Sequence, residues 1–477
     1  MSLLSALRRR AESVFNGPAR TRVVLILAAV LALGTADTGM VGALARELES
    51  AFRISQAGLG LLATVSSGIG ALATIPMGAL ADQVARVRLL IYTIVLWSAA
   101  LLVGGAAQSY LWLLLSRLAL GAVIAAGGPL LASLIGDLIP VGERAKVYGW
   151  ILTGEMIGAG IGLIAGGNIG VALGWRYGFW LLGLLGIALA AAVHRWLPEP
   201  ARGGASRVPP GAAEIPHATP VRLRGNPFAL AGEGGPGAVL QGWRSIWRAF
   251  AYILRIRTIR ILIVASSIGY FFFAGLRTFV VVFVEGWFGV STHQMTALVV
   301  AVGAGAIVGA VLGGRFADRM LRHGRPKARV TVPAVTYTLT AVLFAPGLLT
   351  TSVPVALPFF VVGAAMLGAA NPPLDAARLD IVTPWLWGRA ESARTVLRLA
   401  AEAVAPVCFG LIADWLAGPG GTSKAAGLRD TFLIMLLPLV ANGLIMLRAR
   451  RSYLPDKQAA ERAATADRAP TAAPDPE

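Results

Sequence analysis

The sequence predicts an all-α protein that crosses a membrane twelve times, in two halves of six helices. Hydrophobic residues make up 56% of the 477 residues and charged residues only 14%, which exceeds the apolar share of ordinary soluble domains. Apolar runs of about 20 residues, the length needed to cross roughly 30 Å of hydrocarbon, recur along the chain. A charged segment also repeats, because GALADQVARVRLL from Gly78 resembles GGRFADRMLRHGRPKARV from Gly313. This repetition indicates that the two halves arose by duplication.

The predicted spans form an N-terminal bundle over residues 23–197 and a C-terminal bundle over residues 259–450. The first span has full membrane-crossing length and leads to no small-residue cleavage site, so we expect no cleaved signal peptide. The twelve spans cover residues 23–44, 58–80, 88–107, 110–136, 147–171, 177–197, 260–284, 295–317, 330–350, 354–374, 395–416 and 430–447.

Three polar segments flank these bundles: residues 1–22, a linker at 198–258 and a tail at 451–477. The linker begins with a Pro- and Gly-rich part, which we expect to be mobile. Its second part predicts either a helix lying in the membrane interface or an early extension of span seven, because apolar residues recur at helical spacing beside arginines. The tail has too little apolar surface to fold and is expected to be disordered. The apolar positions of the linker helix are Leu240, Trp243, Ile246, Trp247, Phe250 and Leu254.

The charge distribution predicts the topology and the partners. The net charge is +18, and its basic residues cluster between spans. The positive-inside rule therefore places both termini in the cytosol, in an inner or plasma membrane whose lipids, rather than nucleic acid, are the partner of these charges. The single cysteine, Cys408, excludes an internal disulfide, and we expect no metal and no cofactor. The most basic loop, 318–329, carries Arg319, Arg322, Arg325, Lys327 and Arg329.

Ionisable residues inside spans are costly and usually face a cavity, which makes them candidates for function. Asp37 in span one and Arg117 in span four each lie about seven residues from the outer end, and so reach similar depth. One hypothesis is a proton-sensitive pair, in which protonation of Asp37 releases Arg117. The alternative is a permanent ion pair with a structural role. Glu155 in span five has no evident basic partner, and is a candidate for proton exchange or for contact with a cationic ligand.

Span seven combines aromatic residues with a charge inside the span. Tyr270 and Phe273 precede Arg277 by one to two turns, which suits an amphipathic ligand with an anionic head. The alternative is an aromatic run that faces lipid. Glu285, two turns beyond Arg277, is a candidate gate partner for it at the outer surface.

Span eleven carries two opposite charges one turn apart. Arg398 and Glu402 are spaced i, i+4 and therefore lie on one face of the helix. They are candidates for substrate binding, and the alternative is that they only pair with each other.

The repeated segment and three further stretches resemble the major facilitator superfamily of transporters. These stretches are RLALGAVIAAGG in span four, GWRYGFW at the start of span six and LPEPAR at its end. The resemblance covers nearly the whole chain and implies the twelve-helix fold of that family, with transport by alternating access. The signature after span two matches at Gly78, Leu80, Asp82, Arg86 and Arg88, with Ala85 where the family usually has glycine.

The resemblance also implies two latches that hold the inner gate shut. Asp82 is expected at the start of span eleven, near residues 389–394, and Asp318 at the start of span five, near Arg144. A carboxylate there caps the free N–H groups of the neighbouring helix. The signature arginines either belong to this gate or only mark topology. The gate residues implied are Asp82, Arg86, Arg88, Asp318 and Arg319.

Three longer stretches are GMVGALARELESAFRISQAGLGLLATV, LIGDLIPVGERAKVYGWILTGEMIGAGIGLIAGG and APVCFGLIAD. They are similar to the Spinster branch of the superfamily, which is associated with export of lysolipids and sphingoid lipids and with proton coupling. Asp37 and Arg117 fall on acidic and basic positions of that branch, whereas Ile124 replaces an acidic residue. Span five has Gly158 but lacks the Gly-Pro motif of proton-coupled drug exporters in the superfamily.

Three functions remain open. Motifs of hydrolases, metalloproteases and phosphate-binding loops do not occur in the sequence, which disfavours an enzyme. The first hypothesis is a proton-coupled exporter of amphipathic or hydrophobic small molecules, acting as a monomer among membrane lipids. The second is a symporter or exchanger of organic anions. The third is a transport-inactive sensor or scaffold.

Overall fold

The computed structural model describes residues 10–54, 56–204, 206–216, 235–290, 292–417 and 424–466, and these are almost entirely helical, with no strand among them. Eleven of the described helical segments are long and apolar enough to cross a membrane. Helix α4 (Gln56–Ala81) contains a further, shorter apolar helical stretch, Gly68–Ala81. The prediction of an all-α chain with many spans is confirmed.

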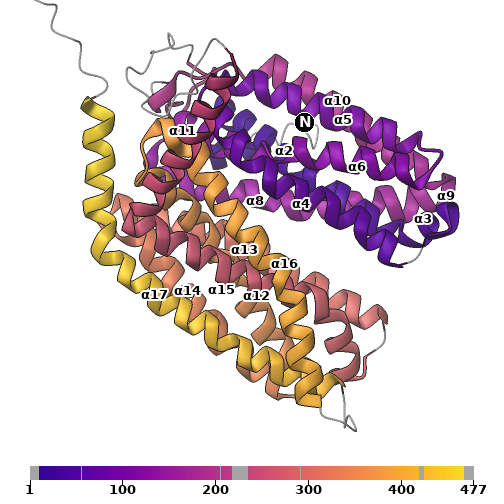
Figure 1. The fold of residues 1–477 in the computed structure, drawn as a ribbon. Helices are drawn as coiled ribbons and strands as arrows, with labels where there is room; N and C mark the ends of the chain where they lie inside the picture. The colour runs from indigo at the N-terminus through magenta and orange to yellow at the C-terminus, as the bar shows by residue number, and fades with distance from the viewer. Residues whose placement is uncertain are drawn as a thin grey trace, which may run out of the picture.

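The N-terminal half is drawn in indigo to magenta in Figure 1, as one group of long helices. Short helices α3 (Ala45–Phe52) and α9 (Val171–Leu173) lie at the end of this half that is remote from the chain terminus. Span four is interrupted, so that it comprises α6 and α7. The long helices are α2 (Pro18–Ala43), α4, α5 (Arg86–Gly105), α6 (Tyr110–Ile124), α7 (Gly127–Leu138), α8 (Arg144–Leu163) and α10 (Trp175–Trp196).

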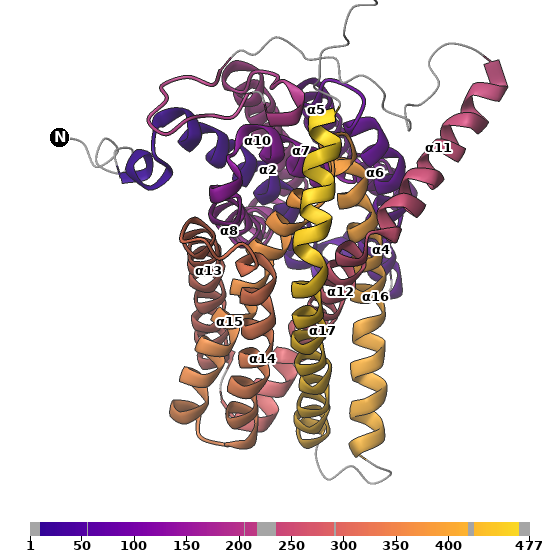
Figure 2. The same cartoon turned by 90° about the vertical axis from the view of Figure 1, so that its left-hand side faces the viewer.

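The C-terminal half forms a second group of helices, and α17 runs along its whole length (Figures 1 and 2). We call the end of the molecule at which α2 begins and α17 ends the terminal face, and the opposite end, with α3 and α9, the far face. The helices of this half are α12 (Arg257–Phe288), α13 (Thr292–Arg322), α14 (Ala328–Leu349), α15 (Val353–Asp380), α16 (Trp387–Ala417) and α17 (Lys424–Ala466).

Glycines allow close approach of helices within each half. On α8, a Cβ added to Gly158 would lie 2.1 Å from the backbone oxygen of Ala32 on α2. On α13, a Cβ added to Gly309 would lie 1.9 Å from the backbone oxygen of Ala365 on α15. These distances are shorter than a van der Waals contact, so the backbones pack this closely because the glycines lack side chains.

The tail differs from its prediction. Helix α17 continues to Ala466, so the expected disorder is wrong for residues 451–466, while 467–477 lie outside the described residues. Tyr453 is fully buried, and its hydroxyl donates a hydrogen bond of 2.9 Å to Asp380 Oδ2. The backbone N–H of Thr258 donates to Asp456 Oδ2 at 3.0 Å. These tertiary contacts stabilise a helix that the polar composition alone does not favour.

The first part of the linker also differs from the expected mobile segment. Residues 199–216, apart from residue 205, pack against the terminal face of the N-terminal half, where Ser206 and Val208 are fully buried. Arg20 Nη2 donates a hydrogen bond of 2.6 Å to the carbonyl of Val208. Gly204 N donates to Asp137 Oδ1 at 2.9 Å. The linker helix itself, α11 (Gly235–Arg255), is present, and its placement in a membrane interface stays a prediction.

Candidate functional site

Asp37 and Arg117 form a bidentate ion pair inside the N-terminal half. Arg117 Nη1 lies 2.5 Å from Asp37 Oδ1, and Nη2 lies 2.7 Å from Oδ2. Only 1% of Asp37 and 4% of Arg117 is exposed, so each charge depends on the other for compensation. Ser66 Oγ donates to the carbonyl of Arg117 at 3.0 Å and fixes α6 against α4. The geometry is that of the expected pair; its role in proton coupling stays a prediction.

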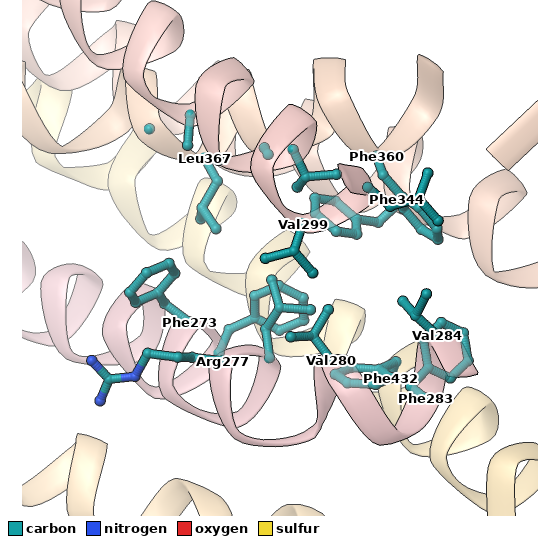
Figure 3. Close-up of a pocket in the computed structure, with 18 of the residues that line it drawn as sticks. Phe273, Arg277, Val280, Phe283, Val284, Val299, Phe344, Phe360, Leu367 and Phe432 are labelled. Atoms are coloured by element: carbon teal, nitrogen blue, oxygen red, sulfur yellow. The ribbon is translucent and has the colours of Figure 1, made fainter. Parts of the chain in front are cut away.

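A cavity of about 350 Å³ opens between helices of the C-terminal half (Figure 3). Phe273 and Arg277 of α12 lie at one end, and the guanidinium of Arg277 points away from the aromatic side chains. The polar lining residues include Glu155 from α8, so the N-terminal half contributes to the wall. The aromatic lining residues are Tyr270, Phe272, Phe273, Phe283, Phe288, Tyr337, Phe344, Phe360 and Phe432.

One predicted residue of α16, Arg398, adjoins this cavity through Tyr270. Arg398 Nε lies 3.4 Å from Glu402 Oε1, as expected from their spacing. The guanidinium of Arg398 also lies 4.5 Å from the ring centroid of Tyr270, a distance suited to a cation–π contact. Because Tyr270 lines the cavity, Arg398 contacts a residue of the cavity wall without lining the cavity itself. The cavity and its immediate surroundings therefore contain five of the predicted residues: Glu155, Tyr270, Phe273, Arg277 and Arg398.

A buried cluster of four charges lies beside Arg398, and sequence reasoning missed it. Glu391 pairs with Arg378 and, at 2.7 Å, with Arg394. Asp375 lies 3.3 Å from Arg378 and 3.6 Å from Arg394. Two acids and two bases compensate each other, which permits their burial. The sequence signal was NPPLDAARLD, where Asp375 and Arg378 stand i, i+3 at the end of span ten.

Asp82, the residue of the first predicted latch, joins the two halves. Its Oδ1 accepts a hydrogen bond of 2.7 Å from Gly388 N, and its Oδ2 one of 3.0 Å from Arg389 N, at the start of α16. This is the expected position. Burial raises the pKa of Asp82 to about 6, although Arg389 and the hydrogen bond from Gly388 N oppose the rise. Nearby, Ser392 Oγ donates to the carbonyl of Thr74 at 2.7 Å.

Asp318, the residue of the second predicted latch, joins the halves at the corresponding place in the other half. Its Oδ2 accepts a hydrogen bond of 2.7 Å from Lys146 N, in the first turn of α8. Arg329 bridges Asp318 and Asp380, at 3.1 Å from each. Arg144 of the N-terminal half lies 3.1 Å from Asp380 Oδ1. The latch therefore includes charges from both halves.

The other predicted gate residues lie apart from these inter-half contacts. Arg86 pairs with Asp137 and Glu199, both in or next to its own half. Arg88 and Arg319 are exposed, and the basic residue beside Asp318 is Arg329, which was not among the predicted gate residues. Glu285 is half-buried on α12, towards the far face.

Comparison with known families shows to which family the chain belongs. The family model of the Major Facilitator Superfamily matches residues 26–373. The chain belongs to this superfamily. Proteins of the superfamily are in general transporters and not enzymes.

Solved structures of transporters share the fold of this chain. A bacterial homolog of the human lysosomal transporter Spinster, in an inward-facing and unoccupied conformation, has 21% identity and a TM-score of 0.54, covering 92% of this chain and 98% of its own. The human organic anion transporter MFSD10 (TETRAN) has 17% identity and a TM-score of 0.64, covering 90% and 99%. The transporter FucP in its outward conformation has 13% identity and a TM-score of 0.66, covering 89% and 98%.

Proposed function

We propose that the protein exports amphipathic or hydrophobic small molecules by alternating access, in exchange for protons. The observation that carries the proposal is the aromatic cavity of about 350 Å³, whose lining includes the charged residues Glu155 and Arg277. An apolar chain gains about 0.8 kcal/mol for each methylene group that it buries in such a cavity. A polar head is held where the charged residues lie. This arrangement suits a single-chain amphiphile.

The contacts of the terminal face support alternating access. The positive-inside rule places this face in the cytosol. The contacts of Asp82 and Asp318 and the hydrogen bond between Ser392 and Thr74 join the halves there, which supports a conformation that is closed on the proposed cytosolic side. Opening of the cytosolic side requires Asp82 to leave α16 and Asp318 to leave α8.

Proton coupling is proposed at the pair of Asp37 and Arg117. Protonation of Asp37 removes the charge that compensates Arg117, and the bidentate pair then loses most of its attraction. A pair that is made in one access state and broken in the other links proton binding to the movement of the two halves. The structure supplies the pair in one state, with both side chains buried.

The test is flux in proteoliposomes that contain a pH-sensitive dye. Lysophospholipids, cationic drugs and organic anions are screened under an imposed pH gradient with the wild type, Asp37→Asn and a control. Asp430→Asn is the control, because Asp430 forms an ion pair whose carboxylate side chain is 39% exposed. Proton movement that depends on a lysophospholipid, and disappears only in Asp37→Asn, is expected. Lysophospholipid flux that is unaffected by the gradient and by Asp37→Asn would exclude the proton role.

Transport of organic anions is the second candidate, because three arginines lie at or near the cavity. Arg277 lines it, while Arg394 and Arg398 both face the ring of Tyr270. MFSD10, one of the structural neighbours, is described as an organic anion transporter. In the same screen this function predicts flux of organic anions, with competition among them. Absence of flux in every class would favour the sensor or scaffold.

A further inference from the structure

Helix α11 presents one exposed stripe of arginines and aromatic residues. Its residues 245, 246, 249, 250 and 253 are buried against the protein, and this set fixes which face points outwards. The opposite face exposes 58% of Trp247 and 44% of Tyr252. The described stripe comprises Arg244, Trp247, Arg248, Ala251, Tyr252 and Arg255, all exposed and spaced three or four residues apart.

The chemistry of this stripe matches an anionic membrane surface. Helix α11 contains no acidic residue between Gly235 and Arg255. Arg257 and Arg260 at the start of α12 are exposed as well and extend the basic surface. Tryptophan and tyrosine favour the level of lipid headgroups, and arginine near the surface is attracted to anionic lipids. A helix that only covered the protein would not need exposed aromatic residues between its arginines.

The position of α11 connects this surface to the gate. Helix α11 contacts α12 and α16 of the C-terminal half and α4 of the N-terminal half. Helices α4 and α16 are the two that Asp82 joins. Figure 2 shows α11 leaving the bundle at the terminal face, beside these helices. A constraint on α11 therefore acts at the junction that must separate when the terminal face opens.

We propose that the exposed stripe of α11 binds anionic phospholipid headgroups, and that this binding favours the closed terminal face. The lipid holds α11 at the membrane surface through Arg244, Arg248 and Arg255, with Trp247 and Tyr252 inserted between headgroups. In that position α11 keeps its contacts with both α4 and α16. The proposal does not depend on the identity of the transported molecule or on proton coupling.

The test measures the closed fraction with two spin labels at the terminal face. Val84 and His323 are exposed, lie in different halves and are replaced by cysteine in a Cys408→Ser background. Double electron–electron resonance distances are recorded in phosphatidylcholine vesicles and in equimolar phosphatidylcholine and phosphatidylglycerol vesicles. The stripe variant Arg244→Gln/Arg248→Gln/Arg255→Gln is compared with Arg448→Gln/Arg450→Gln/Arg451→Gln, which removes the same charge from exposed residues of α17.

Phosphatidylglycerol is expected to raise the ratio of closed to open molecules by about fivefold in the wild type, the factor for one arginine near an anionic surface. The α17 variant should keep this response, and the stripe variant should lose it. High salt should weaken it. An unchanged ratio in the wild type, an intact response in the stripe variant, or an equal loss in both variants would overturn the proposal. Native mass spectrometry should likewise count fewer bound phosphatidylglycerol molecules on the stripe variant alone.

Discussion

Asp82 and Gly388 are 306 positions apart in the chain, yet the carboxylate Oδ1 accepts a hydrogen bond of 2.7 Å from the Gly388 backbone. The contact caps the first turn of α16, whose N–H groups have no partner within the helix. It also joins the two halves at the terminal face. Under the proposed alternating access, the energy of this single cap contributes to the equilibrium between the closed and open conformations.

Removal of the cap should open the terminal face. Asp82→Ala leaves the N–H groups of Gly388 and Arg389 without their acceptor, whereas Asp82→Asn keeps one acceptor oxygen. A helix cap is worth about 0.5–2 kcal/mol, so the ratio of closed to open molecules should be about twofold to thirtyfold lower in Asp82→Ala than in Asp82→Asn. The spin labels at positions 84 and 323 measure this ratio. Equal ratios in the two variants would contradict the capping role.

Acid should favour the closed conformation through the same residue. The pKa of Asp82 is about 6 when buried and 3.8 at its ordinary value, which we expect once the residue leaves α16. The closed state therefore binds the proton more tightly; this stabilisation is complete below about pH 3.8 and is lost as the pH rises through 6. Lowering the pH from about 7 to 5 should increase the ratio of closed to open molecules by about tenfold. Asp82→Asn should lack this part of the pH dependence in the same distance measurement.

Replacement of Gly78 by alanine should be unfavourable in the closed conformation, because there residues of the other half lie against this glycine. A Cβ at Gly78 would lie 1.9 Å from Ser392 Oγ and 2.7 Å from the carbonyl oxygen of Gly388. Gly78→Ala should therefore shift molecules towards the open terminal face. Gly34→Ala is the matched control, because nothing lies within 4 Å of a Cβ there, and alanine favours helix over glycine. Cysteine labels at the terminal face report the shift, and equal behaviour of the two variants would contradict it.

The sequence predicted the helices well because membrane-crossing length and hydropathy are local properties. The similar depth of Asp37 and Arg117 in the membrane was also enough to predict that their side chains meet. The positions of Asp82 and Asp318 followed from the family signature rather than from local physics. Their roles in gating stay predictions.

Contacts between distant segments were the part that the sequence did not reveal. Arg329 lies beside Asp318 although the two residues are 11 positions apart, because the first turn of α14 brings this one basic residue against the end of α13. The cluster around Glu391 and Arg378 lies near the ends of apolar runs. Charged residues at such positions cannot be distinguished by sequence from those of exposed loops, so the cluster was not predicted. The helical extension beyond residue 451 depends on Tyr453, whose burial no local pattern indicates.

Removal of the Asp37 charge should strongly lower the free energy of unfolding. Asp37→Asn leaves Arg117 buried without its compensating charge, and the loss of one partner of a buried pair costs about 3–5 kcal/mol. The double variant Asp37→Asn/Arg117→Gln removes both charges and should recover most of this loss. Thermal unfolding in detergent, followed by tryptophan fluorescence, compares the three proteins. A double variant no more stable than Asp37→Asn would show that the pair is not the source of the effect.

Filling the aromatic cavity should weaken binding of an amphiphile without affecting the latches. Ala306 lines the cavity, and Ala306→Trp places an indole where an apolar chain is proposed to lie. Displacement of two methylene groups, at about 0.8 kcal/mol each, weakens binding by more than about tenfold. Val300→Trp is the control, because Val300 is 64% exposed and does not line the cavity. Binding of a fluorescent lysophospholipid to the purified proteins measures the difference. The spin-label distances at the terminal face should be unchanged in both variants, which separates loss of the cavity from a shift of the gate, and equal affinities would exclude this cavity as the binding site.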